Sequence, residues 1–81
     1  MGIILAIDDD KHILNILRQQ IEKLGHDIIL AESGKEGLEY ALAGNPDVIL
    51  LDIIMPELSG HDVIKKLHSE ELTKLTPVIM L

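Results

Sequence analysis

Four short apolar runs are distributed along the chain and are separated by longer segments of mixed character. The runs cover residues 2–7, 28–31, 47–52 and 77–81. Unbroken apolar runs of this length, rich in Ile, Leu and Val, are typical of strands that are buried on both faces of a parallel sheet. The pattern therefore predicts four buried β-strands.

The segment after the first run has the periodicity of an amphipathic helix. Its apolar residues recur at spacings of 3, 4 and 3, and polar side chains occupy the opposite face. These apolar residues are Leu14, Leu17, Ile21 and Leu24. We expect a helix from about residue 10 with Leu14, Leu17 and Leu24 in the core. Gly25 should end it, because glycine readily adopts the left-handed conformation that often follows a helix.

Two further helices are indicated by their N-terminal residues. Residues 33–36 have the capping-box pattern, in which Ser33 accepts the N–H of Glu36 and the Glu36 carboxylate accepts the N–H of Ser33. This helix should end at the breaker residues 44–46. Ser59 is placed to cap a third helix. The residues expected to face inward are Leu38, Ala41 and Leu42 in the second helix and Val63, Ile64 and Leu67 in the third.

The alternation of strands and helices predicts the α/β fold class. Parallel strands joined by right-handed helical crossovers form a doubly wound sheet with helices on both faces. A length of 81 residues supports a single domain, residues 1–81. In the doubly wound order 2-1-3-4, the first and third strands are neighbours.

Carboxylates stand at the ends of two of these strands. Asp8 and Asp9 follow the first run, and Asp52 ends the third. Ligands of open parallel sheets bind outside the carboxyl ends of the strands, so we expect the three carboxylates to converge there. Converging negative charges repel one another unless a cation neutralises them, and Mg²⁺ or Mn²⁺ suits an all-oxygen set of ligands. The absence of Cys and of a nearby His disfavours zinc and copper.

The charge balance narrows the range of partners. Fourteen acidic and seven basic residues give a formal charge of −7, which disfavours nucleic acid and anionic membrane surfaces. The apolar residues 1–7 lack a basic flank and run into three aspartates, so we expect neither a signal peptide nor a membrane span. We therefore expect a soluble, cytoplasmic protein.

Three motifs together resemble the receiver domains of two-component response regulators. They are Ile7-Asp8-Asp9-Asp10, Leu50-Leu51-Asp52 and Met55-Pro56-Glu57-Leu58-Ser59-Gly60. The resemblance implies a flavodoxin-like fold with strand order 2-1-3-4. It also implies a phosphoprotein of a phosphorelay, which takes a phosphoryl group from a sensor histidine kinase or a phosphotransfer protein.

The resemblance also implies a role for each site residue. Asp52 resembles the phosphoacceptor, which becomes an aspartyl phosphate. Asp9 resembles the direct ligand of Mg²⁺, Asp8 a second or water-mediated carboxylate, and Ile54 the residue whose backbone carbonyl completes the coordination. Pro56 disfavours helical backbone at Met55, which should aim the Ile54 carbonyl at the site. We expect a phosphoacceptor with self-catalysed phosphorylation and dephosphorylation, not a turnover enzyme.

The resemblance covers the first two thirds of a receiver. The family places a Ser or Thr after the fourth strand and a Lys after a fifth, and both positions lie beyond Leu81. We therefore expect a C-terminally incomplete receiver whose fourth strand has an exposed edge. Such an edge offers unpaired backbone groups to another chain, which predicts a homo-oligomer.

Alternative interpretations concern the function and single residues. A degenerate receiver fragment could act only in protein interaction or dimerisation. A haloacid-dehalogenase-like phosphohydrolase could use Asp8, although Lys11 and His12 then follow where that family has Thr or Val. Asp8 and Asp9 could also be acids that only favour a helix start, and Asp10 is the expected N-cap. All four histidines are expected to be exposed to solvent, namely His12, His26, His61 and His68.

Overall fold

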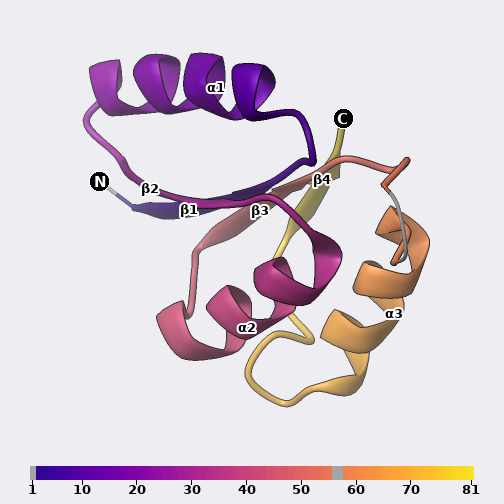
Figure 1. The fold of residues 1–81 in the computed structure, drawn as a ribbon. Helices are drawn as coiled ribbons and strands as arrows, with labels where there is room; N and C mark the ends of the chain where they lie inside the picture. Colours follow the sequence, from indigo (N-terminus) through magenta and orange to yellow (C-terminus); the bar gives the residue numbers. More distant parts are fainter. Residues whose placement is uncertain (1, 56–57) are drawn as a thin grey trace.

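Strands and helices alternate along the chain in the computed structural model, which describes residues 2–55 and 58–81 (Figure 1). In chain order the elements are β1 Ile3–Ile7, α1 Lys11–Lys23, β2 Asp27–Ala31, α2 Gly34–Gly44, β3 Val48–Leu51, α3 Gly60–Ser69 and β4 Val78–Met80. The predicted sequence of elements is confirmed. Three strands are shorter than their apolar runs, with Asp47 and Asp52 lying just outside β3, whereas β2 also includes Asp27.

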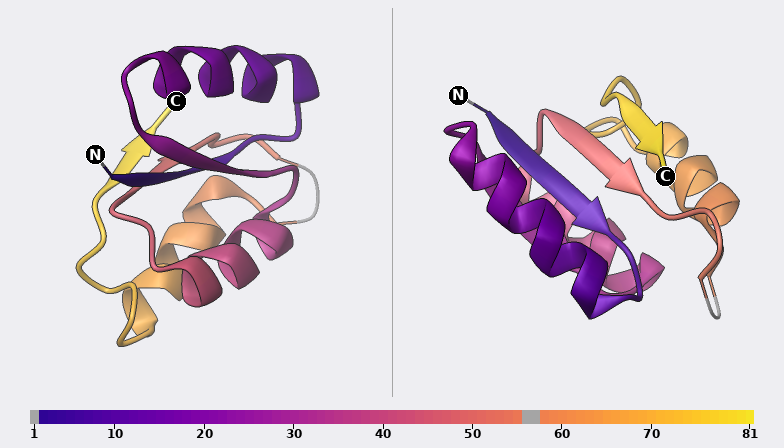
Figure 2. Two further views of the ribbon diagram at one scale, coloured as in Figure 1. Left: turned by 90° about the vertical axis from the view of Figure 1, so that its left-hand side faces the viewer. Right: turned by 90° about the horizontal axis from the view of Figure 1, so that it is seen from above.

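The sheet has the strand order β2-β1-β3-β4, and all neighbouring strands in it are parallel. Helix α1 lies on one face, and α2 and α3 lie on the other (Figure 1, Figure 2). The predicted α/β class, doubly wound topology and strand order are therefore confirmed. Because the strands are parallel, their carboxyl ends meet at a single edge of the sheet, next to the start of α1.

The hydrophobic core lies between the sheet and the pair α2 and α3. It contains fully buried side chains from β1, β3 and α3. Among them are Leu5, Ile7, Ile49, Leu51, Val63 and Leu67. Burying one such side chain contributes roughly 1.5–3 kcal/mol. The core thus holds α3 firmly against β3 and β4.

Side-chain caps and glycine conformations fix the helix ends as predicted. Asp10 Oδ1 accepts the N–H of His12 at 2.9 Å, and Gly25 has a φ of 86° after α1. Ser33 Oγ accepts the N–H of Glu36 at 3.1 Å, and Ser59 Oγ caps α3. The reciprocal half of the predicted capping box is wrong: Glu36 Oε1 accepts the N–H of Glu32 at 2.8 Å instead of that of Ser33.

Two leucines expected in the core are exposed. Leu24 is 71% exposed and Leu42 is 37% exposed, whereas Leu14 is buried and Leu17 is half-buried. Leu24 follows the last residue of α1, and Leu42 lies at the edge of the face that α2 packs inward. Apolar spacing indicates a helix face, but burial also requires a neighbouring element to cover that position.

Three of the four histidines are exposed, as expected, but His26 is not. It is half-buried, and its Nδ1 accepts the N–H of Gly2 at 3.1 Å. Nearby, Asp47 Oδ2 accepts the N–H of Ile3 at 2.8 Å. These two side chains hold the start of β1, at the edge of the sheet opposite Asp8 and Asp52.

Part of the sheet face beside α1 is uncovered. Seen from above, α1 lies along the β2 side, and β3 and β4 are visible beside it (Figure 2). Val78 and Met80 pack against the core, so by alternation Ile79 and Leu81 face the α1 side. They are 53% and 50% exposed. None of the described helices is long and apolar enough to cross a membrane.

Candidate metal centre

The pairing of β1 with β3 brings Asp8 and Asp52 to the same place. Ile7 and Leu51, the last residues of these two strands, are partners in the parallel register. The backbone continues this pairing by one step, because Asp52 N–H donates to the Ile7 carbonyl at 2.9 Å. On the other side of β1, Asp8 N–H donates to the Ala31 carbonyl at 3.0 Å. The sheet therefore fixes the backbone beneath both carboxylates.

Three carboxylates converge at this edge of the sheet. One oxygen each from Asp8, Asp9 and Asp52 lies within 4.8 Å of the other two. Asp8 is buried, Asp52 is half-buried and Asp9 is exposed. The predicted convergence is thus present, in a cluster that opens toward solvent through Asp9.

Backbone hydrogen bonds orient two of the carboxylates. The N–H of Asp10 donates to Asp8 Oδ1 at 2.9 Å, and the N–H of Ile54 donates to Asp52 Oδ1 at 3.3 Å. Each bond engages one oxygen and leaves the second free for another ligand. Asp10 itself does not join the cluster, because its carboxylate caps α1.

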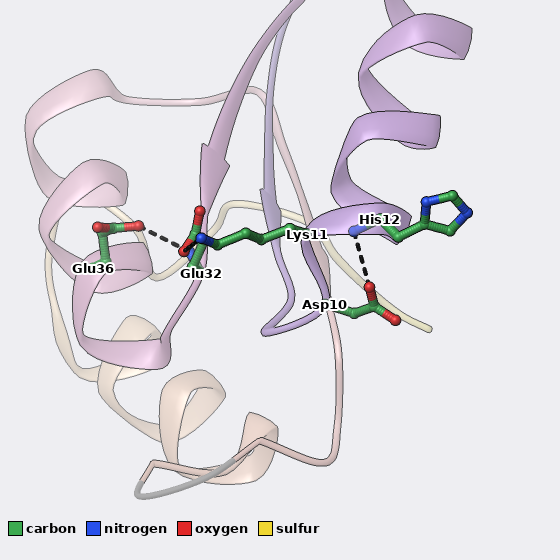
Figure 3. Close-up of polar contacts among 5 residues, drawn as sticks. All are labelled: Asp10, Lys11, His12, Glu32 and Glu36. Atoms are coloured by element: carbon green, nitrogen blue, oxygen red, sulfur yellow. Dashed lines mark hydrogen bonds and ion pairs between the residues drawn. The ribbon is translucent and has the colours of Figure 1, made fainter.

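The start of α1 is also tied to the loop after β2. Figure 3 shows Lys11 Nζ reaching toward Glu32, at 3.8 Å from its Oε1, while Glu36 holds the backbone of Glu32. Asp10 and His12 lie on the other side of the helix start. Both partners of the ion pair are largely exposed, so it contributes at most about 1 kcal/mol. It draws Lys11 toward β2, on the opposite side of β1 from Asp52.

Burial raises the pKa of Asp8 above its usual value of 3.8. Desolvation is the largest cause, and the hydrogen bond from the Asp10 N–H opposes it by stabilising the charged form. The negative charges of Asp52, Asp9 and Asp10 raise the pKa further. Without a cation, the ionised form of Asp8 is therefore disfavoured in the folded protein.

This pKa shift predicts an unusual pH dependence of stability in metal-free buffer. A folded-state pKa above the unfolded one means that the folded protein binds the proton first as the pH falls. The contribution of Asp8 to folding is therefore unfavourable above its folded-state pKa, and this penalty is relieved as the pH falls toward 3.8. Asp8→Asn should raise the melting temperature at pH 7. It should also remove the gain in stability that protonation of Asp8 gives at lower pH.

Thermal unfolding between pH 7 and pH 4 with a chelator measures this effect. Asp47→Asn is a matched control, because Asp47 also accepts a backbone N–H but lies at the opposite edge of the sheet. If the melting temperature fell equally in both variants, ionised Asp8 would not be the source of the unfavourable contribution to folding.

The donor set of the cluster fits a hard divalent cation. All the grouped side chains are carboxylates, two of which keep one oxygen free of backbone hydrogen bonds, and the exposed side leaves room for water ligands. Ile54 follows Asp52 on the adjoining loop, and its side chain is 83% exposed. The role of its carbonyl as a ligand stays a prediction. The Pro56 and Glu57 part of the third motif lies outside the described residues.

The fold and this cluster together define the class of the protein. A doubly wound parallel sheet with two acidic residues after β1 and one after β3 has the architecture of a receiver domain. The family described as "Response regulator receiver domain" matches residues 4–81. The chain belongs to this family.

Two relatives are similar to this chain over nearly its whole length. The chain is 38% identical over 78 residues to the alkaline phosphatase synthesis transcriptional regulatory protein PhoP of Bacillus subtilis, covering 96% of this chain and 32% of PhoP. It is 38% identical over 80 residues to protein PilH of Pseudomonas aeruginosa, covering 99% of this chain and 66% of PilH. The chain thus spans about one third of the length of PhoP and about two thirds of the length of PilH.

Solved structures have the same fold. The N-terminal domain of a response regulator receiver protein from Methanoculleus marisnigri superposes with a TM-score of 0.96 at 34% identity, covering 99% of this chain and 65% of that one. The chemotaxis protein CheY4 of Vibrio cholerae superposes with a TM-score of 0.94 at 30% identity, covering 99% and 67%. The family assignment leaves the haloacid-dehalogenase interpretation without support.

Proposed function

We propose that Asp52 accepts a phosphoryl group from a sensor histidine kinase or a phosphotransfer protein, with Mg²⁺ held by Asp8, Asp9, Asp52 and the Ile54 carbonyl. The observation that carries this proposal is the approach of three carboxylate oxygens to within 4.8 Å at the ends of β1 and β3. Burial raises the pKa of Asp8, and the negative charges of Asp52 and Asp9 add to this effect, so the ionised cluster is unfavourable without a cation. A site of this kind is suited to a cation and to the phosphate oxygens that the cation attracts.

The chemistry follows from the position of Asp52. One of its carboxylate oxygens attacks phosphorus in line with the leaving group, the bond from phosphorus to the leaving nitrogen or oxygen breaks, and an acyl phosphate forms. The leaving group keeps the electron pair. The Ile54 N–H and the end of β3 orient the attacking carboxylate. Bound Mg²⁺ would offset the negative charge on the phosphoryl oxygens.

Incubation with acetyl phosphate and Mg²⁺ tests the proposal. We expect one hydroxylamine-labile phosphoryl group per chain, detected by intact mass. Repeated turnover of acetyl phosphate without an adduct would indicate a hydrolase instead. The absence of both adduct and turnover would favour the alternative of a degenerate receiver that acts as an interaction module.

We also propose that the 81-residue chain associates with itself through β4. Ile49 N–H donates to the Pro77 carbonyl, and Leu81 N–H donates to the Leu51 carbonyl. The alternate residues Val78 and Met80 therefore direct their backbone groups away from β3, along an edge that no described strand covers. Such an edge can pair with that of a second copy.

Association of this kind predicts that the melting temperature rises with protein concentration. Met80→Pro removes an outward N–H without removing a bond to β3, so it should suppress the concentration dependence and leave a folded monomer. Analytical ultracentrifugation at micromolar concentration measures the association state of the unmodified chain and of Met80→Pro. A compact monomer for the unmodified chain would contradict the proposal.

A further inference from the structure

Gly60, the first residue of α3, lies against the backbone that carries Asp52. Gly60 is buried, and its N–H donates to the Ile53 carbonyl at 2.9 Å. A Cβ atom at Gly60 would lie 2.7 Å from the Asp52 carbonyl oxygen and 2.7 Å from Ile53 Cα. These distances are shorter than Cβ contacts in folded proteins, so a side chain at this position requires the backbone to move.

Other buried glycines are crowded by side chains instead. A Cβ at Gly37 in α2 would lie 2.7 Å from Ile7 Cγ1, and one at Gly34 would lie 2.9 Å from Val63 Cγ2. At Gly37 and Gly34 the atoms that must shift belong to side chains of the packed core, so replacement there costs stability. At Gly60 the atoms that must shift belong to the backbone that carries Asp52. Gly60 is therefore the glycine whose replacement acts directly on the site.

Of the two segments in contact at Gly60, the loop is the one that would yield. Helix α3 is anchored by Val63 and Leu67, which are fully buried, and by the Ser59 cap. The loop is anchored in the core through Met55, but its part before Met55 is held less firmly, since the Ile54 side chain is 83% exposed and its N–H makes a long bond of 3.3 Å to Asp52. A methyl group at residue 60 should therefore displace the peptide between Asp52 and Ile53.

We propose that Gly60 is a positioning residue, whose missing side chain lets α3 set the place of Asp52 and of the Ile54 carbonyl relative to Asp8 and Asp9. This inference rests on the proposed function of the cluster. Helix α3 would thus position the site through a backbone contact at Gly60, without supplying a side chain to the chemistry. The contact between the start of α3 and the loop would keep the Asp52 carboxylate next to Asp8 and Asp9, which follow β1.

Gly60→Ala tests the inference against Gly37→Ala, a control with similar crowding against a side chain. Both variants should lose thermal stability. Only Gly60→Ala should also weaken Mn²⁺ binding, followed by paramagnetic relaxation, and slow labelling by acetyl phosphate, each by roughly tenfold to a hundredfold at a temperature where the variants are folded. Equal Mn²⁺ affinity and labelling rate in the two variants would show that Gly60 serves stability alone.

A measurement on the unmodified chain covers the case in which Gly60→Ala does not fold. In a Mg²⁺ titration followed by NMR, the amides of Gly60 and Ile53 should shift together with that of Asp52, and the amide of Gly37 should not. Unshifted amides at Gly60 and Ile53 would overturn the inference. If the unmodified chain neither binds metal nor takes up phosphate, the proposed function itself is wrong, which is a different result.

Discussion

Replacing Asp52 by alanine should abolish labelling by acetyl phosphate completely. Asp52 directly follows β3 and belongs to the acidic cluster, and its carboxylate is the nucleophile in the proposed transfer. Asp52→Asn should have the same effect while keeping an oxygen that accepts the Ile54 N–H. The adduct is measured by intact mass and located by peptide mapping after borohydride trapping.

The control for this prediction lies at the other end of β3. Asp47→Asn alters the carboxylate that precedes β3, at the opposite end from Asp52, and should leave labelling unchanged. A label found on Asp8, on Asp10 or on a histidine would reject Asp52 as the acceptor. It would also remove the premise on which the role of Gly60 depends.

Mg²⁺ should stabilise the unmodified chain, and Asp9→Asn should remove most of that effect. A cation at ten times its dissociation constant adds about 1.4 kcal/mol, which raises the melting temperature of a chain of this size by roughly 6–11 °C. Asp9→Asn removes one proposed ligand and one of the three converging charges. The variant should therefore be at least as stable as the unmodified chain in a chelator and respond weakly to Mg²⁺.

Asp10→Asn is the matched control, because it removes one charge from the adjacent position and keeps a side-chain oxygen that can cap α1. It should respond to Mg²⁺ like the unmodified chain. If Asp9→Asn and the unmodified chain gained the same stability from Mg²⁺, the site would be wrongly placed.

Local chemistry along the sequence was sufficient to predict the helix ends. Asp10, Ser33 and Ser59 cap the three helices, and Gly25 adopts a left-handed conformation, because each of these effects involves only neighbouring residues. The convergence of Asp8 and Asp52 was also predictable, once the strand order followed from the alternation of elements. Two neighbouring parallel strands end side by side, so the residues that directly follow them lie close together.

Features that depend on distant neighbours were not predicted. Leu24 has the spacing of a core residue but follows the last residue of α1 and is exposed to solvent. Thr73 lies between α3 and β4, yet it is 1% exposed and its hydroxyl donates to the Leu67 carbonyl at 2.7 Å. His26 accepts a hydrogen bond from the N–H of Gly2, which precedes β1. No local pattern reveals such partners, since they are set by tertiary packing.

The site itself was predicted only in part. The close approach of Gly60 to the carbonyl of Asp52 could not be located from the sequence. The bond from the Asp10 N–H to Asp8 was likewise not predicted, although Asp side chains commonly accept a hydrogen bond from the backbone N–H two residues on. Both features depend on the exact course of the backbone after a strand end.

The parallel pairing of β1 and β3 also bears on how long the folded state lasts. Neighbouring parallel strands cannot form as a local hairpin, so β3 reaches β1 only after the intervening chain has folded across the sheet. Asp8, Asp9 and Asp52 come together only when this central pair is in register. A cation held there would therefore oppose the separation of β1 from β3 and slow unfolding. It would accelerate folding only to the extent that this pair is already formed in the transition state.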